Sequence, residues 1–286
     1  YPTGKKSSEE NLFKWIVSDF GLNDAIESGL VKTPRVVIRD DGVPDAKTYR
    51  SKLYHIYPHV KDDINRSAQE HEPLPDLVIN GYYLLGKDWL ETLKTWEQAG
   101  FKAPPVMITV ANRTETAARV NYAFYHKSIR IDVLCATEKI LHIDSKVLKE
   151  AEDREDSTIS IELTDEEGEP RKISKKEEAE RLRLTVDTVG KIGQPGEQIQ
   201  NVISVGMLSE GWDAKTVTHI MGLRAFTSQL LCEQVVGRGL RRTSYDVQPE
   251  TGLFEPEYVN IFGVPFTFLP HEKVDGPPPT PPPPKQ

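Results

Sequence analysis

Cysteine is scarce in this chain of 286 residues, which contains only Cys135 and Cys232. Both stand in apolar stretches far apart in the sequence, and neither has a Cys or His partner at the spacing of a zinc site. We therefore predict two reduced core residues, and we assign no metal ligand to the chain. Cysteines of this kind are typical of a cytoplasmic protein.

Long apolar runs are also missing. No stretch approaches the roughly 20 apolar residues that a membrane helix needs, and no signal peptide is visible. Hydrophobic residues make up 37% of the sequence, so a chain of this length can bury one substantial core. We expect a cytoplasmic protein with no membrane partner.

A complete phosphate-binding loop is absent as well. The nearest string, residues 3–7 (TGKKS), lacks the upstream glycine, and Lys6 stands where such loops have Ser or Thr. An apolar run that ends in Asp40 and Asp41 resembles an acidic Mg²⁺ motif, but without a phosphate loop we interpret it as a strand end and a turn. These gaps argue against a self-contained nucleotide hydrolase.

Positive charge is in deficit, because the net charge is -8. This balance argues against strong stand-alone binding to nucleic acid, whose affinity comes largely from neutralised phosphates. The acidic residues are concentrated in residues 149–183. Alternation over 159–163, a turn at Gly168 and a cap at Ser174 predict a charged hairpin followed by a short helix.

The most informative order of elements is in the last third of the chain. Residues 201–208 are short, apolar and rich in β-branched side chains, which predicts a buried strand, and 217–223 predicts another. The polar loop 209–213 (SEGWD) follows the first strand, so its Ser and Asp are expected at the carboxyl edge of the sheet, where α/β proteins bind ligands. Thr227 or Ser228 can cap a helix that begins at Gln229.

Residues 234–242 (QVVGRGLRR) place two arginines, Arg238 and Arg241, three positions apart. The guanidinium group is planar, forked and always charged, so it suits phosphate oxygens. On one helical face the two side chains can reach the same phosphate. The alternative is a solvated basic helix end, where arginines complement the helix dipole.

This order resembles the second RecA-like domain of superfamily 2 helicases and translocases. The loop 209–213 is similar to their motif V, residues 234–241 to motif VI, and residues 105–116 (PVMITVANRTET) to motif IV. The similarity is closest to the motor (Res) subunit of type III restriction enzymes and to related DEAD/DEAH box helicases. It covers roughly residues 100–265 well and the first hundred residues more loosely.

The resemblance implies roles only at matching positions. Arg241 would be the arginine finger on the γ-phosphate of ATP, and Arg238 a second phosphate contact. The nucleotide side would include Gln234, Gly237, Gly211 and Asp213. The nucleic-acid backbone would be contacted by Ser209, Asn112, Arg113 and Thr114, although Asn and Thr are also ordinary helix starts. We interpret Trp212 as a packing residue.

The fold that the resemblance implies is α/β and RecA-like, with a mainly parallel sheet, helices on both faces and the charged hairpin-helix inserted near 149–183. Residues 1–75 would link to a first motor domain outside this sequence, residues 76–270 would form the second motor domain, and 271–286 a Pro-rich linker. Within the first hundred residues we predict strands at 35–39 and 52–57 and a helix at 87–98, with Trp89 in the core.

A helicase motor binds ATP between two RecA-like domains, and the first supplies the phosphate loop and holds Mg²⁺. The chain is therefore expected to be half of an ATP-hydrolysing DNA motor, inactive alone. Its partners would be DNA and the first domain, and in restriction-enzyme relatives a nuclease domain and a methyltransferase subunit.

Two alternatives stay open. One is a RecA-like module that binds DNA or a partner without serving a motor. The other is a stand-alone nucleotide hydrolase that uses Lys5 or Asp40 and Asp41.

Overall fold

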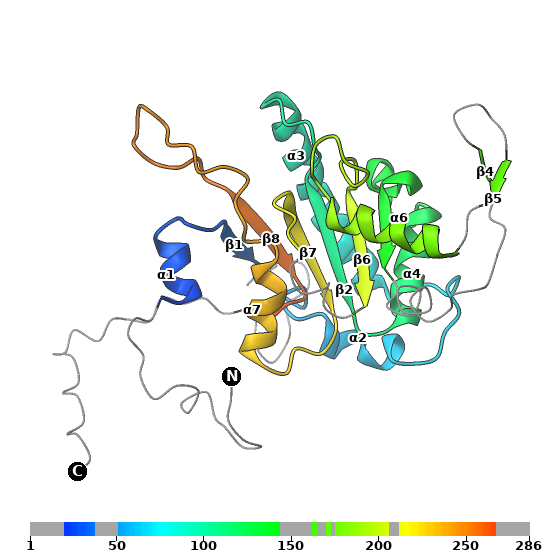
Figure 1. Cartoon of the computed structure of the whole chain (residues 1–286). Coiled ribbons are helices and arrows are strands. Elements are labelled where there is room, and N and C mark those ends of the chain that lie inside the picture. Colours follow the sequence, from blue (N-terminus) through cyan, green and yellow to red (C-terminus); the bar gives the residue numbers. More distant parts are fainter. Residues whose placement is uncertain are drawn as a thin grey trace, which may run out of the picture.

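The computed structural model describes residues 20–37, 51–143, 162–164, 170–172, 175–205 and 212–266. Six strands form one sheet in the order β1-β8-β7-β2-β6-β3, and each neighbouring pair is parallel (Figure 1). The strands are β1 (Thr33–Val36), β2 (Val106–Ala111), β3 (Ile140–Ile143), β6 (Asn201–Val205), β7 (Val217–Leu223) and β8 (Tyr258–Phe262). The predicted α/β class with a mainly parallel sheet is confirmed.

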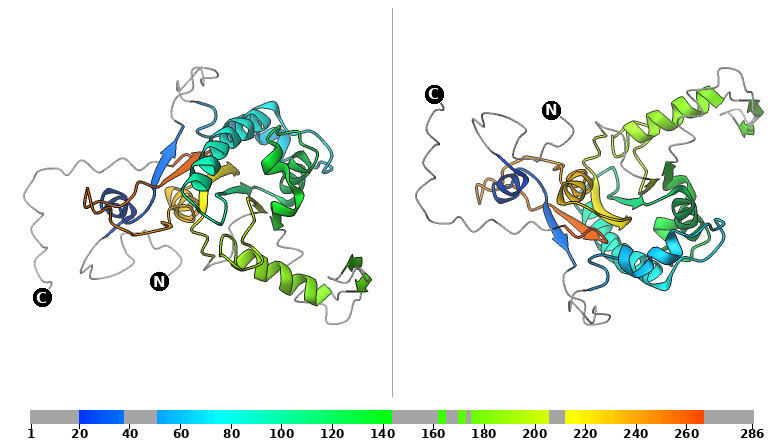
Figure 2. Two further views of the ribbon diagram at one scale, coloured as in Figure 1. Left: turned by 90° about the horizontal axis from the view of Figure 1, so that it is seen from above. Right: turned by 90° about the horizontal axis from the view of Figure 1, so that it is seen from below.

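Helices cover both faces of the sheet (Figure 2). The first face carries α2 (Tyr57–Ile64), α3 (Asp76–Gln98) and α4 (Thr114–Tyr125), and the second carries α6 (Lys175–Asp187) and α7 (Gln229–Gly237). Shorter helices are α1 (Leu22–Glu27), η2 (Asp132–Cys135) and η3 (Thr137–Lys139). Every residue of β2 and β7 is buried, as expected of parallel strands with helices on both sides.

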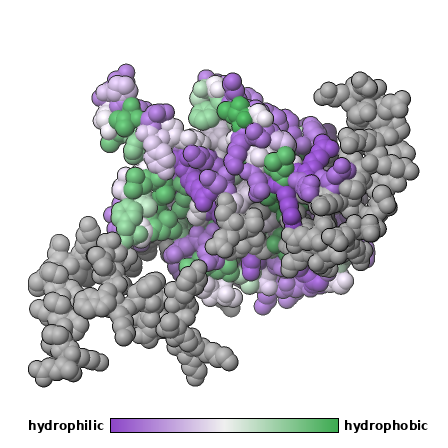
Figure 3. Space-filling view, in the orientation of Figure 1, coloured by the Kyte–Doolittle hydropathy of each residue, from purple (hydrophilic) through white to green (hydrophobic). Residues whose placement is uncertain are grey.

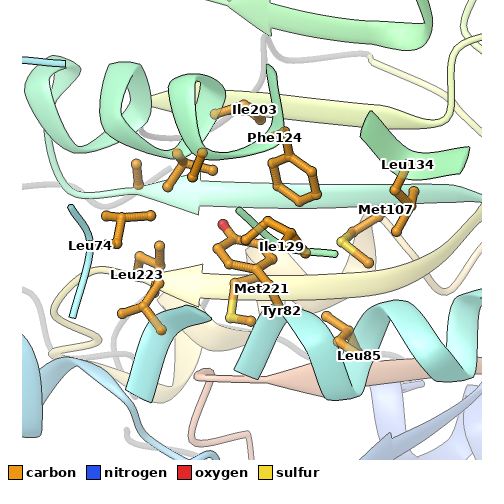
Figure 4. Packing of buried hydrophobic residues seen from close by; sticks show 14 of the residues in the cluster. Leu74, Tyr82, Leu85, Met107, Phe124, Ile129, Leu134, Ile203, Met221 and Leu223 are labelled. Carbon is orange, nitrogen blue, oxygen red and sulfur yellow. The ribbon is translucent and has the colours of Figure 1, made fainter. Parts of the chain in front are cut away.

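Two hydrophobic cores follow from the alternation of side chains along the strands. Met107 and Ala111 of β2 face the first core, whereas Ile108 and Val110 face the second. In the first core Tyr82 of α3 and Phe124 of α4 meet edge to face, with ring centroids 5.2 Å apart (Figure 4). The Tyr82 hydroxyl forms a hydrogen bond of 2.8 Å with Thr109 Oγ1, so its buried polar atom has a partner.

Several predicted elements are confirmed. Strand β7 has the predicted bounds, and the Ser228 hydroxyl accepts a hydrogen bond of 3.2 Å from the Leu231 amide, so helix α7 begins at Gln229. Helix α3 ends at Gln98 as predicted but begins at Asp76, and Trp89 is fully buried within it. Both cysteines are buried and unbridged.

The strand predicted at residues 52–57 is wrong. A turn occupies residues 52–54, a bend follows at His55, and helix α2 begins at Tyr57 with Pro58 in its first turn. Proline lacks the amide that a ladder needs, and its fixed φ suits the start of a helix. The apolar spacing of Leu53, Ile56 and Val60 serves the first core from a turn and a helix.

Residues 20–37 and 51–75, which the sequence analysis treated as a linking segment, contribute to the sheet and to a core. Strand β1 pairs with β8 from Thr33 opposite Tyr258 to Val36 opposite Ile261. Helix α2 buries Val60 and Ile64 in the first core. The boundary at residue 76 and the linker at 271–286 stay predictions, and residues 267–286 lie outside the described part.

The charged insertion contains the predicted hairpin and helix. Strands β4 (Glu162–Thr164) and β5 (Pro170–Lys172) pair antiparallel as a separate two-stranded sheet, and α6 follows. The helix continues to Asp187, past the predicted limit of residue 183, and buries Val186 in the second core; Val189, just after the helix, lies in the same core. The end of the insertion is thereby attached to the domain.

The surface differs between the two ends of the sheet. In Figure 3 hydrophilic side chains gather over α6, whereas apolar side chains gather over α1. Exposed apolar residues at that end include Phe20, Leu30, Val247 and Leu253. Among the described residues, no helix is long and apolar enough to cross a membrane.

Candidate functional site

The two predicted phosphate-binding arginines lie beside the amino-terminal edge of the sheet. Arg238 is the residue after α7, and Arg241 follows the buried Leu240. The carbonyl of Leu240 accepts a hydrogen bond of 2.7 Å from the amide of Lys32, which directly precedes β1. This contact fixes the backbone next to Arg241 at the edge where the strands begin.

Arg241 is held but remains accessible. Its Nη1 lies 2.6 Å from Asp213 Oδ1, and it also donates a hydrogen bond of 3.2 Å to the carbonyl oxygen of Trp212. The side chain of Arg241 is 46% exposed and that of Asp213 is 48% exposed. An ion pair this accessible is weak in water, so an anionic ligand can replace the carboxylate at low cost.

Arg238 lies close enough to Arg241 for their charges to interact. Burial, and then the positive charge of Arg241, lowers the pKa of the Arg238 guanidinium from its ordinary value. Two neighbouring cations at the carboxyl end of a helix repel each other, and both attract an anion. The helix dipole there favours cations and repels anions, so the arginines must supply all the attraction for a phosphate.

Gln234 and Gly237 lie on the same end of α7. Gln234 is exposed, and it stands one helical turn before Arg238, so the two side chains share a face. A side chain at Gly237 would meet nothing within 4 Å, whereas a Cβ at Gly239 would lie 2.8 Å from Val259 Cγ2. The packing of the domain therefore requires glycine at 239, whereas the space beside Gly237 is open.

The neighbouring arginine, Arg242, has a different role. It is only 4% exposed, and its guanidinium donates hydrogen bonds to the carbonyl oxygens of Ser244 and Glu255 and lies 3.5 Å from Glu257 Oε1. Arg242 holds the loop before β8, whereas Arg241 points outward. The resemblance selected the accessible member of this adjacent pair.

Lys32, a fully buried lysine at the same edge, was not among the residues predicted from the sequence. Its Nζ donates hydrogen bonds of 2.6 and 2.7 Å to the carbonyl oxygens of Lys215 and Val217. Burial lowers the pKa of Lys32 to about 8, although the charge of Glu257 partly opposes this. Lys32 ties β1 to the start of β7 and to the segment carrying Arg241, and no motif signals this role.

The position expected for Asp213 needs a correction. The loop 209–213 was expected at the carboxyl edge of the sheet, but Asp213 lies four residues before β7 begins, beside the amino edge. Because β6 and β7 are parallel, the connection must return from one edge to the other, and Asp213 stands at its end. Ser209 and Gly211 lie outside the described residues.

Trp212 is a packing residue, as predicted. It is 3% exposed and lies in the second core, and its Nε1 donates a hydrogen bond of 2.8 Å to the carbonyl oxygen of Val186. This contact joins the end of α6 to the segment that carries Asp213. The anchored indole thereby fixes the carboxylate that holds Arg241.

Asn112, Arg113 and Thr114 lie at the opposite, carboxyl edge, between β2 and α4. Helix α4 begins at Thr114, so this segment is the helix start that the alternative interpretation allowed. Five residue intervals along β2 at about 3.3 Å each separate the two edges by about 16 Å. The structure therefore does not bring this group together with Arg238 and Arg241.

The Asn112 amide and the Arg113 guanidinium of this second segment donate their hydrogen bonds within the protein. Arg113 Nε and Nη2 donate hydrogen bonds of 2.9 and 2.7 Å to the two carboxylate oxygens of Glu115, and Asn112 donates one of 2.7 Å to Asn65 Oδ1. The Thr114 hydroxyl lies 3.2 Å from a Glu115 oxygen. The Arg113 guanidinium, followed by a backbone hydrogen bond, lowers the pKa of Glu115 to about 2.

Within the described ranges, no group of three or more His, Cys, Asp or Glu side chains is arranged to hold a metal ion. Lys5, Asp40 and Asp41, on which the stand-alone hydrolase depends, lie outside the described residues.

Comparison with known proteins gives little independent information. No family model matches the chain, and no curated protein matches it. A similar solved structure is that of the ATP-dependent Type ISP restriction-modification enzyme LlaBIII bound to DNA, with a TM-score of 0.38 and 14% identity over 85% of this chain. The match covers 13% of that protein. A likeness this distant says nothing about the activity of the chain.

Proposed function

We propose that this chain is the second motor domain of an ATP-dependent DNA helicase or translocase, of the kind found in type III restriction enzymes. The observation that carries the proposal is the state of Arg241. It is half exposed, is held by an equally exposed carboxylate, and stands beside a second arginine, while the next arginine in sequence is buried.

In this proposal Arg241 and Arg238 contact the γ-phosphate of ATP bound against a first motor domain. A water oxygen attacks the γ-phosphorus, the bond to the β–γ bridging oxygen breaks, and ADP and inorganic phosphate leave. Negative charge on the transferred group in the transition state is stabilised by the two guanidinium groups. Gln234, Gly237, Gly211 and Asp213 would line the nucleotide side, and the first domain would hold Mg²⁺.

Asp213 would also keep Arg241 in position before ATP binds. Its carboxylate and the γ-phosphate offer the same forked guanidinium equivalent oxygen acceptors. The phosphate carries more charge, so it can displace the carboxylate as the two domains close. Binding ATP would in this way break the contact between the motif V segment and the end of α7.

DNA would bind through Ser209 and, at the opposite edge of the sheet, through the segment Asn112 to Thr114. Arg113 would first have to leave its bidentate pair with Glu115, so we expect it to contribute less to DNA affinity than its charge suggests. The sequence resemblance to type III restriction enzymes extends the proposal to a nuclease domain and a methyltransferase subunit as partners.

The test is DNA-stimulated ATP hydrolysis by the polypeptide that joins this chain to a first motor domain. Arg241→Lys keeps the charge but loses the fork, so kcat is expected to fall by about a thousandfold or more. The matched control is Arg66→Lys, because Arg66 is similarly exposed and is paired with Asp63 and Glu72. That control is expected to keep near-normal turnover.

Near-normal turnover by Arg241→Lys would remove the arginine-finger role. The chain alone supplies a second arm of the test. Without the first domain it is expected to hydrolyse no ATP, and turnover that Arg241→Ala abolishes would instead mean that a complete site lies in these 286 residues. DNA binding that ignores ATP in the whole protein would favour the non-motor module.

A further inference from the structure

Three aromatic rings gather at the carboxyl end of α4, away from the segments discussed above. The ring centroids of Tyr122 and His126 lie 3.9 Å apart with planes inclined by 32°, and those of Tyr125 and His126 lie 5.1 Å apart. Tyr125 is 59% exposed, and His126 is exposed as well. Exposed rings that gather in this way offer flat faces on which a planar ligand can stack.

The turn after these rings presents two basic side chains. Lys127 and Arg130 both have left-handed backbone, with φ values of 57° and 59°, and both are exposed. The Lys127 and Ser128 amides donate hydrogen bonds to the carbonyl oxygens of Phe124 and Ala123, which closes the helix as glycine usually does. Glycine adopts this conformation without the strain that a Cβ introduces.

The geometry of the turn is imposed by its apolar residues. Ile129 and Ile131 are 1% and 2% exposed and belong to the first core, where Ile129 lies close to Tyr82 and Phe124 (Figure 4). With these two side chains inside, Lys127 and Arg130 are directed outward. A strained backbone that carries charged side chains in place of glycine points to a function for the side chains.

These basic groups are weakly engaged within the protein. Lys127 Nζ lies 3.7 Å from Asp132 Oδ1, and the two side chains are 65% and 83% exposed. In the described part of the chain, the Arg130 side chain forms no hydrogen bond or ion pair of its own. The dipole of α4 favours cations near its carboxyl end, which accounts for a positive charge at Lys127. It accounts neither for the exposed aromatic rings nor for the left-handed backbone at Arg130, which lies beyond the end of the helix.

We propose that Tyr122, Tyr125, His126, Lys127 and Arg130 form a binding surface for single-stranded nucleic acid. Unpaired bases stack on exposed aromatic rings, and lysine and arginine at the rim neutralise the phosphates between successive bases. Because the net charge of the chain is -8, it can attract nucleic-acid phosphates only through a local cluster of positive side chains such as Lys127 and Arg130. The proposal does not depend on ATP hydrolysis or on Arg241.

The test measures binding to the full 286-residue chain by fluorescence anisotropy, in the absence of ATP. The probes are labelled oligo(dT) of about 12 nucleotides, a length within the range of known single-strand sites, and a labelled duplex of equal length. Tyr125→Ala is expected to weaken oligo(dT) binding about tenfold. Lys127→Gly and Arg130→Gly should each keep or raise Tm, weaken binding, and reduce the slope of log K against log salt by about 0.7. Because these glycine variants relieve strain, lost binding cannot be attributed to misfolding.

The matched control is the pair Tyr83→Ala and Lys87→Ala on α3, where a lysine likewise lies over an exposed tyrosine ring, 5.6 Å from its centroid. These changes should leave oligo(dT) binding intact. Unchanged binding in the three patch variants would overturn the proposal, as would equal losses in the control pair. Duplex bound as tightly, with the same response to Tyr125→Ala, would also overturn it, because stacked bases are then not the ligand.

Discussion

The end of α7 and the start of α4 carry similar polar residues but use them differently. At the end of α7, Arg241 is half exposed, and its partner Asp213 is equally exposed. At the start of α4, Arg113 is held by both oxygens of Glu115, and Asn112 by Asn65. An arginine in a recognisable motif is therefore available to a ligand only where the neighbouring side chains do not already bind it.

A residue committed to the fold should cost stability when it is removed, and a residue kept for a ligand should not.

Arg119 and Arg241 should differ most. Arg119, on α4, is 2% exposed, pairs with Asp63 at 2.9 Å, and donates to the carbonyl oxygens of Glu72 and Pro73. Arg119→Ala leaves these groups without their partner, so we expect a loss of unfolding free energy on the order of 3 kcal/mol. Arg241→Ala should change it by less than about 1 kcal/mol.

Urea denaturation of the two variants measures this contrast. Equal losses of stability would mean that Arg241 is a structural residue, and the division between the two regions would fail.

The two glycines near the end of α7 give a smaller contrast. Gly239→Ala would bring a Cβ to 2.8 Å from Val259 Cγ2 and 3.0 Å from Ile220 Cδ1, so we expect a loss of about 1–3 kcal/mol. Gly237→Ala meets open space in a helical backbone and should be neutral or stabilising by up to about 1 kcal/mol.

Thermal unfolding followed by circular dichroism distinguishes these glycine variants. A destabilised Gly237→Ala would show that this glycine serves packing, which would weaken the case for a ligand there.

The smallest effect concerns pH at the start of α4. The pKa of Glu115 is about 2 in the folded protein, below its ordinary value of 4.5, so the folded state favours the carboxylate. Its contribution is present above pH 4.5 and is lost as the pH falls toward 2. Because the pair is partly exposed, we expect it to contribute less than about 1 kcal/mol to the free energy of unfolding.

Glu115→Gln should therefore flatten the stability profile between pH 4.5 and 2 relative to the unmodified chain. An identical slope in both proteins would show that the Arg113 pair contributes nothing to folding, and Arg113 would then be free for the DNA contact that the resemblance implied.

Local sequence determined much of the fold. The apolar β-branched run 217–223 became β7 without change, and the hydroxyl of Ser228 started α7 where predicted, because both signals act over a few residues. The same local reasoning failed at 52–57, where alternating apolar residues predicted a strand. There Pro58 starts a helix, and the core accepts those side chains from a turn.

Residue types and their spacing were enough to predict the parallel α/β class and the charged hairpin-helix, and to select Arg238 and Arg241 as phosphate candidates. Contacts in the folded chain were needed to show that Arg242 is buried while Arg241 is accessible, that Asp213 reaches the amino edge, and that Lys32 fixes the segment beside Arg241. Motif and periodicity report residue type and spacing, whereas availability depends on contacts between residues far apart in the chain. Lys32 and Val217 are 185 positions apart, and no short-range pattern records their hydrogen bond.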